Sequence, residues 1–148
     1  RGSKQLIAFR VPGFETGFVA RARDGVRGPG DAMVQARVRR ADQEGRFDDI
    51  AGRGFMIIAR DGNPAAALSP EIRDYWASLG GRMVRIGKTA AAPDVLIDAE
   101  GQYTRLMDEY GCDVIVKRPD FHIFGACPTL RELPALIADL RDQLGVAA

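Results

Sequence analysis

The stretch from Cys112 to Cys127 constrains the fold most, because its pattern predicts that the chain turns back on itself. Two apolar runs rich in β-branched residues flank Pro119 and Asp120, a pattern typical of a β-hairpin. Proline presets the backbone for the first central position of a turn, and aspartate is common at the second. A two-residue turn at this pair predicts that Cys112 lies directly opposite Cys127.

Alternation of side chains along a strand predicts that the two faces of this hairpin differ. One face is almost wholly apolar, and we expect it to join the main core: Cys112, Val114, Val116, Ile123 and Cys127. The other face is mixed, and we expect it to be only partly covered: Asp113, Ile115, Lys117, His122 and Phe124.

Strand and helix signals alternate along the chain before the hairpin. The short apolar run at 54–59 is typical of a buried strand. Ser69 and Pro70 are a helix N-cap and a first-turn proline, so a helix is expected directly after them. Two further extended segments are expected, a strand at 83–86 and a short piece at 94–98.

Two more helices complete the order of elements. Apolar residues at helical spacing predict a helix that ends at Gly111. The last helix is expected near Thr129, which has capping-box spacing to Glu132, while Pro134 makes its first turn irregular or moves its start. The resulting order, β-α-β-α-β-β-α, predicts an α/β fold of the thioredoxin-like type, a mixed four-stranded sheet flanked by helices.

The N-terminal segment differs in composition from the rest of the chain. Residues 1–46 are rich in Gly and Arg and hold ten Lys and Arg against five Asp and Glu. Strands are expected at 5–11 and 32–38, but no complete core is visible. We therefore divide the chain into a basic lead-in or linker, 1–46, and a thioredoxin-like domain, 47–148. The lead-in is either a solvated segment or a surface that docks on another domain.

Composition limits the classes of function. A net charge of +1 over 148 residues gives no basis for binding nucleic acid or a membrane surface, and no apolar run approaches the roughly 18 residues that cross a bilayer. Two cysteines do not make a disulfide scaffold, so we expect a cytoplasmic protein. Because the chain begins at Arg1 rather than methionine, we expect a piece of a longer protein.

The cysteines do not match a thioredoxin redox site. That chemistry needs Cys-x-x-Cys after the first strand, where a helix N-terminus lowers the thiol pKa. Residues 60–66 occupy this position without a cysteine. Cys112 and Cys127 stay open as a redox pair, which would make the chain a stand-alone thiol oxidoreductase. The interpretation we favour is two small buried hydrophobic residues.

No other group of residues predicts a catalytic, cofactor-binding or metal site. His122 is the only histidine; it lacks partners at metal-binding spacing and is expected to be half-exposed. The pairs Asp48–Asp49 and Asp108–Glu109 are typical of turns and helix surfaces. The sequence contains no Gly-x-Gly-x-x-Gly motif for dinucleotide binding.

Three stretches of the chain together resemble the C-terminal region of FAD-dependent aromatic-ring hydroxylases, of the 3-(3-hydroxyphenyl)propionate hydroxylase and phenol hydroxylase type. These stretches are residues 30–38, 47–55 and 114–120. The chain departs from the family pattern at two neighbouring positions. Phe121 stands where the family often has glycine, and His122 stands where it often has an aromatic residue. The motif positions that carry the resemblance are Asp49, Gly52, Gly54, Arg118, Pro119 and Asp120.

The resemblance implies a thioredoxin-like domain without redox cysteines, which follows the FAD and substrate domains of a parent enzyme. The parent would hydroxylate a phenolic ring with FAD, NAD(P)H and oxygen, and this chain would hold no cofactor itself. Its partners would be the FAD and substrate domains and, in a homodimer, a second copy. The implied function is structural or oligomerising and non-catalytic. The alternative is a stand-alone thiol-redox or binding module of the same fold.

Overall fold

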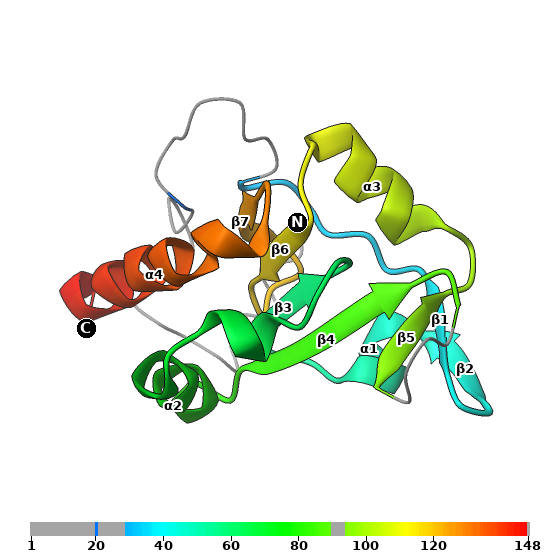
Figure 1. Ribbon diagram of the computed structural model, residues 1–148, viewed down its shortest axis with the longest axis horizontal. Helices are drawn as coiled ribbons and strands as arrows, with labels where there is room; N and C mark the ends of the chain where they lie inside the picture. The colour runs from blue at the N-terminus through cyan, green and yellow to red at the C-terminus, as the bar shows by residue number, and fades with distance from the viewer. Residues whose placement is uncertain (1–19, 21–28, 90–93, 148) are drawn as a thin grey trace.

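The computed structural model describes residue 20, residues 29–89 and residues 94–147. These residues contain seven strands: β1 Arg37–Arg40, β2 Gln43–Arg46, β3 Met56–Ala59, β4 Arg82–Gly87, β5 Val95–Asp98, β6 Val114–Lys117 and β7 Ile123–Cys127. The strands form one sheet in the order β2-β1-β5-β4-β3-β6-β7 (Figure 1). The pairs β3–β4 and β4–β5 are parallel and the others antiparallel, so the sheet is mixed.

Helices cover both faces of this sheet (Figure 1). The four α-helices and two 3-10 helices in the described ranges are α1 Phe47–Ala51, η2 Pro64–Ala67, α2 Pro70–Ser78, α3 Gln102–Tyr110, η3 Leu130–Glu132 and α4 Leu133–Ala147. Trp76 of α2 and Leu136 of α4 belong to one core cluster, and Phe47 of α1 and Met107 of α3 belong to a second cluster. None of these helices combines the length and the apolar character needed to cross a membrane.

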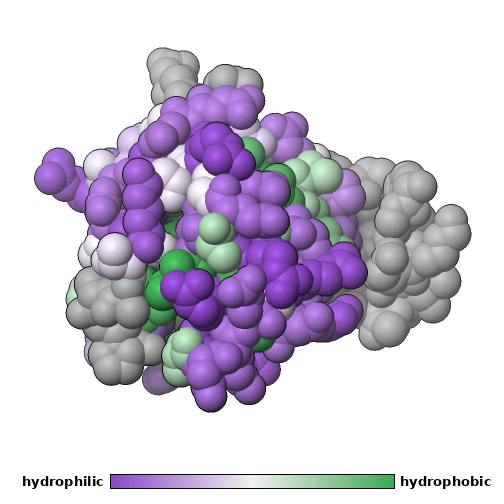
Figure 2. Space-filling view, turned by 90° about the vertical axis from the view of Figure 1, so that its right-hand side faces the viewer, coloured by the Kyte–Doolittle hydropathy of each residue, from purple (hydrophilic) through white to green (hydrophobic). Residues whose placement is uncertain are grey.

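The prediction of a four-stranded sheet is wrong in its strand count. The strands expected at 54–59, at 83–86 and in the hairpin occur, and these four lie side by side in the order β4-β3-β6-β7. The extended piece expected at 94–98 is β5, and β1 and β2 add two more strands beyond it. The sequence of β2 is charged and mostly exposed, so no hydrophobic period marks it. The β2 side of the molecule is mostly hydrophilic (Figure 2), as expected for a sheet edge that avoids pairing with other chains.

The segment expected to be a lead-in contributes to both sheet and core. Val38 is fully buried in β1, and the strand expected at 32–38 lies instead at Arg37–Arg40. Ala32 makes only an isolated bridge to the hairpin. The expected division between residues 46 and 47 therefore runs through the sheet. The strand expected at 5–11 lies outside the described residues.

Local capping signals predicted the helix boundaries correctly. The Ser69 hydroxyl accepts a backbone hydrogen bond in the first turn of α2, and α3 is followed by Gly111 at a φ of 66°. Thr129 and Glu132 form a capping box around η3. The first turn is thus irregular and α4 begins next to Pro134, because a proline within the first turn of an α-helix loses no intrahelical hydrogen bond.

The turn between β6 and β7 encloses three residues between Arg118 and His122 rather than the expected two. The Arg118 N–H donates to the His122 carbonyl at 2.8 Å and closes the loop. Phe121 has a φ of 65°, the left-handed conformation typical of the last residue in a three-residue hairpin loop. The longer loop shifts the pairing of the two strands by one residue, and a register shift between Val116 and Lys117 adds a second, so the predicted register is wrong.

As a result, Cys112 and Cys127 do not face each other. Cys127 lies opposite Val114 and packs in the cluster with α2 and α4, whereas Cys112 packs in the cluster on the opposite face. Both thiols are free and buried. Every residue of β6 and β7 is buried, so the expectation of a partly covered second face is wrong within the strands, whereas Asp113 and His122 outside them are partly exposed. The reason is that helices cover both sides of the hairpin.

Candidate functional site

The three stretches that carry the family resemblance meet at one pocket of about 360 Å³. The first and second stretches line it directly, and the third ends next to it at the hairpin loop. Together with one residue of β2, they define what we call the resemblance pocket: Met33, Gln35, Arg46, Asp48, Asp49, Arg53 and Phe121. Stretches that are far apart in sequence are therefore adjacent in the fold.

The second stretch is a one-turn helix followed by a turn that requires glycine. Gly52 and Gly54 have φ values of 100° and 98°, which side chains other than glycine rarely adopt. A Cβ at Gly52 would also lie 2.9 Å from Nε of Arg82. This turn carries the chain from α1 into β3 and presents the Gly54 carbonyl to Lys117.

Lys117 connects the second stretch to the hairpin from within the protein. Its side chain is 1% exposed, and Nζ donates to the carbonyls of Gly54 at 3.1 Å and Arg118 at 3.2 Å. Nζ also lies 5.1 Å from the centroid of the Phe121 ring, within cation–π range. Burial lowers the pKa of Lys117 below its ordinary value. Lys117 is thus an internal link between the two motifs.

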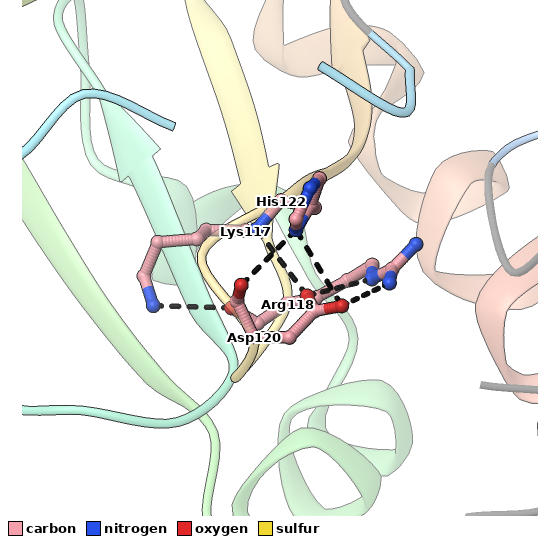
Figure 3. A network of polar contacts seen from close by, with 4 residues as sticks. All are labelled: Lys117, Arg118, Asp120 and His122. Carbon is pink, nitrogen blue, oxygen red and sulfur yellow. Dashed lines mark hydrogen bonds and ion pairs between the residues drawn. The ribbon is translucent and has the colours of Figure 1, made fainter. Parts of the chain in front are cut away.

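Arg118 and Asp120 form a buried ion pair within the hairpin loop (Figure 3). Nε of Arg118 donates to Oδ1 of Asp120 at 2.9 Å, a second guanidinium nitrogen donates to Oδ2, and the side chains are 6% and 4% exposed. Oδ1 also accepts from the backbone N–H of His122 at 3.3 Å, an interaction that favours aspartate in turns. The His122 side chain is 38% exposed, as expected. The Arg-Pro-Asp motif therefore stabilises the loop that carries Phe121.

Phe121 holds a strained backbone conformation at the edge of the resemblance pocket. A left-handed φ costs a residue with a Cβ roughly 1–2 kcal/mol relative to an ordinary conformation, and strain of this kind clusters at functional sites. The glycine that the family often has here would carry no such cost. The phenylalanine is thus the residue that distinguishes this chain's pocket from the family pattern.

A comparison of two substitutions separates backbone strain from side-chain contacts at this position. We expect Phe121→Gly to be about 1 kcal/mol more stable than Phe121→Ala, because both remove the ring and only glycine relieves the left-handed strain. Urea denaturation of the two variants measures the difference. Equal midpoints would show that the loop does not hold this φ in solution.

Asp48 is buried, contrary to the surface position expected for the Asp48–Asp49 pair. Its side chain is 6% exposed, and Oδ2 lies 3.8 Å from Arg53, whose own side chain is 72% exposed. Among the described residues, Oδ1 has no hydrogen-bond partner. A buried acceptor without a donor costs about 1–3 kcal/mol. Asp48 therefore lines the pocket while its Oδ1 atom is buried and left unsatisfied by the rest of the described chain.

Arg60 occupies the position at which a thioredoxin-type site would carry its cysteines. It directly follows β3, and its guanidinium donates to Oδ1 of Asp113 at 3.0 Å and Oδ1 of Asp108 at 2.6 Å. Asp108 lies on the exposed surface of α3, as expected. Arg60 therefore links the end of β3 to α3 and to the residue before β6 through two ion pairs.

The thiols also lack the surroundings of a redox pair. Cys112 and Cys127 lie on opposite faces of the sheet, and burial raises the pKa of Cys112 to about 11. A raised pKa reduces the thiolate fraction that attacks disulfides. The geometry that made these two residues a candidate pair is thus absent.

Sequence reasoning missed the roles of three residues: Asp48 and Phe121, which line the pocket, and the buried Lys117, which lies against Phe121. One usable signal was the position of Lys117 after three consecutive apolar residues, since such runs mark strands covered on both faces. Within the described ranges, His, Cys, Asp and Glu side chains do not gather into a group that could hold a metal. The pocket is lined by charged side chains of both signs and by an aromatic ring.

The fold and the pocket define a mixed α/β domain whose motif residues contact one another within the domain. A model of the family described as "HcaD C-terminal domain" matches residues 30–143. The chain belongs to this family, and the resemblance to the C-terminal region of aromatic-ring hydroxylases is confirmed.

Curated relatives are aromatic hydroxylases. The chain is 29% identical over 112 residues to a probable NADH-specific resorcinol 4-hydroxylase of Rhodococcus jostii, covering 75% of this chain and 21% of the relative. It is 32% identical to a 3-(3-hydroxy-phenyl)propionate/3-hydroxycinnamic acid hydroxylase of Burkholderia vietnamiensis, covering 86% of this chain and 22% of the relative. The chain thus spans about a fifth of the length of these relatives.

Solved structures share the fold. The flavin-dependent monooxygenase PieE, solved with FAD and substrate, superposes with a TM-score of 0.58 at 20% identity, covering 88% of this chain and 25% of PieE. Peroxidoxin BcpB of Mycobacterium tuberculosis superposes with a TM-score of 0.54 at 14% identity, covering 78% of this chain and 97% of BcpB. The likeness to a peroxidoxin agrees with the predicted α/β class.

Proposed function

We propose that this chain is the non-catalytic C-terminal domain of an FAD- and NAD(P)H-dependent monooxygenase that hydroxylates a phenolic ring. The observation that carries the proposal is the family match over residues 30–143 in a chain that corresponds to only 21–22% of the two hydroxylases described above. The FAD and substrate of the parent would be bound by domains outside this chain.

The role we propose is structural: the domain docks on the FAD and substrate domains and supports oligomerisation. In support, the polar groups of the motifs are engaged within the domain, Arg118 with Asp120 and Lys117 with the Gly54 carbonyl. Groups used in this way stabilise a shape and are not directed at a reacting molecule. A cytoplasmic location is part of the proposal, because both cysteines are free, as is usual in reducing compartments.

Two measurements test this function. The purified chain mixed with FAD and desalted should show no flavin absorbance. The parent enzyme truncated before residue 30 should release FAD at a temperature several degrees below that of the full-length enzyme, because it lacks a domain that stabilises the folded state. Flavin bound at one per chain would contradict a non-catalytic role. An unchanged FAD-release temperature together with an unchanged oligomeric state would contradict a structural role.

A further inference from the structure

We propose that the resemblance pocket binds a small aromatic acid, a molecule that carries a carboxylate on a single ring. The inference goes beyond the proposed function and stands without it, because it concerns only side chains of this chain. The pocket has a volume of about 360 Å³, at the small end of the range for ligand pockets, which suits a one-ring molecule. Charged and apolar side chains line the pocket together, and they define the two halves of the ligand.

The carboxylate half of the ligand follows from Arg46. This residue lines the pocket and is exposed, and among the described residues it has no ion-pair partner. It lies directly opposite Arg37 in the β1–β2 pair, and like charges at opposed positions of a sheet repel each other. A ligand carboxylate at Arg46 would pair with its guanidinium and relieve this repulsion.

The two aspartates of the pocket are held by a different arginine. One guanidinium nitrogen of Arg53 lies 3.8 Å from Oδ2 of Asp48, and the other lies 3.9 Å from Oδ1 of Asp49. The Asp48 side chain is only 6% exposed, so it presents almost no carboxylate surface to a ligand. With Arg46 and the buried Lys117, three positive groups stand against these two carboxylates at or beside the pocket. The excess of one positive charge favours an anion.

Gln35 supplies a second, neutral donor for the carboxylate. Its Oε1 accepts the backbone N–H of Asp48 at 3.1 Å, which leaves Nε2 at the other end of the amide. Within the described ranges, this Nε2 has no hydrogen-bond partner, and the residue lines the pocket with its side chain partly exposed. A guanidinium and an amide donor together match the two acceptor oxygens of a carboxylate.

The aromatic half of the ligand follows from Phe121 and Met33, which line the same pocket. Phe121 stays partly exposed, although Nζ of Lys117 lies over its ring at 5.1 Å from the centroid. A ring and a thioether favour aromatic neighbours. Phe121 holds its place at a φ of 65°, where the family pattern often has glycine, and strain that a glycine would relieve indicates a function. The ring side of the site is therefore a feature of this chain.

Two-dimensional NMR of the nitrogen-15-labelled chain, titrated with 3-phenylpropionate, tests the inference. We expect a Kd of about 1 mM or lower, which is ordinary for a ligand of this size, with the side-chain amide signals of Gln35 among those that shift most. Two further probes separate the halves of the ligand: 3-phenylpropanamide keeps the ring without the charge, and propionate keeps the charge without the ring. Each should bind about ten-fold more weakly than 3-phenylpropionate.

Three variants assign the halves of the ligand to residues. Arg46→Met removes a side chain that makes no capping hydrogen bond at the start of α1, so the fold is kept. It should weaken binding of 3-phenylpropionate about ten-fold and leave binding of the amide unchanged. Phe121→Gly removes the ring together with the backbone strain and should weaken binding about five-fold. The matched control, Arg131→Met, removes an exposed arginine of η3 outside the pocket and should bind like wild type.

Each contrary result overturns a stated part of the inference. Signals that shift mainly outside the pocket, or an affinity lost equally in Arg131→Met, would overturn the location of the site. Equal affinity for the acid and the amide, or an Arg46→Met variant that binds like wild type, would overturn the carboxylate half. A Phe121→Gly variant that binds like wild type would overturn the aromatic half. Spectra that do not change at concentrations well above the expected Kd would overturn the whole inference.

Discussion

Replacement of Asp120 by alanine is expected to destabilise the domain by about 3–5 kcal/mol, because it leaves a buried arginine without its carboxylate. The Arg118 and Asp120 side chains are 6% and 4% exposed. The substitution also removes the acceptor for the His122 backbone N–H, so the loop loses a second interaction. Urea denaturation measures the loss, and a cost below about 1 kcal/mol would show that the pair is solvated in solution.

Asp120→Asn and a double variant separate charge from turn geometry. Asparagine keeps an acceptor for the turn and removes only the negative charge, so its cost should be smaller than that of alanine. The double variant Arg118→Met with Asp120→Asn removes both charges. We expect the double variant to lose about 2 kcal/mol less stability than the sum of the losses in the two single variants, because it leaves no unpaired charge buried. Strict additivity would contradict a direct coupling.

Lys117→Ala is expected to cost about 3 kcal/mol. Alanine removes three buried methylene groups, each worth about 0.8 kcal/mol, and leaves the carbonyls of Gly54 and Arg118 without their donor. Part of this loss is offset because the buried ammonium is itself costly. Lys117→Met keeps most of the side-chain volume and removes only the ammonium, so its cost should be about 1 kcal/mol.

The pH dependence of stability, compared between wild type and Lys117→Met, tests whether the Lys117 ammonium is buried in solution. The pKa of Lys117 is lowered by burial from 10.5, so the unfolded chain binds more protons than the folded chain between the lowered pKa and 10.5. Stability from this group therefore rises with pH across that window. Wild type should gain stability relative to Lys117→Met as pH rises toward 10.5 and then level off. A difference that is constant with pH would show that Lys117 titrates normally.

Features set by neighbouring residues could be predicted from the sequence. The helix starts at Ser69 and Thr129 and the stop at Gly111 depend on side chains and backbone angles within one turn of the chain. The strands expected at 54–59 and 83–86 depend on apolar runs, and these also occur. The edge strand β2 escaped prediction, because charged exposed residues without an apolar period carry no such signal, and β1 was placed several residues too early.

The hairpin register shows where local reasoning fails. Pro119 and Asp120 are compatible with turns of two or three residues, and the loop length follows from the left-handed conformation of Phe121. A glycine at position 121 would have indicated a left-handed conformation and so a three-residue loop, whereas a phenylalanine does not. The extra loop residue and the irregularity in the strand pairing between Val116 and Lys117 together changed the partner of Cys127 from Cys112 to Val114. Cys112 lies before the start of β6 and packs on the face opposite to Cys127.

By itself, the sequence determined the order of the strands and helices from residue 54 onward, most of their caps, the family resemblance and the lack of cysteine at residues 60–66. Only the tertiary structure decided that Lys117 and Asp48 are buried and that two of the three stretches line one pocket beside the third. The physical reason is range: caps and apolar periods act over a few residues. The pocket instead depends on contacts such as that between Lys117 and Gly54, which are 63 residues apart and meet only when β3 pairs with β6.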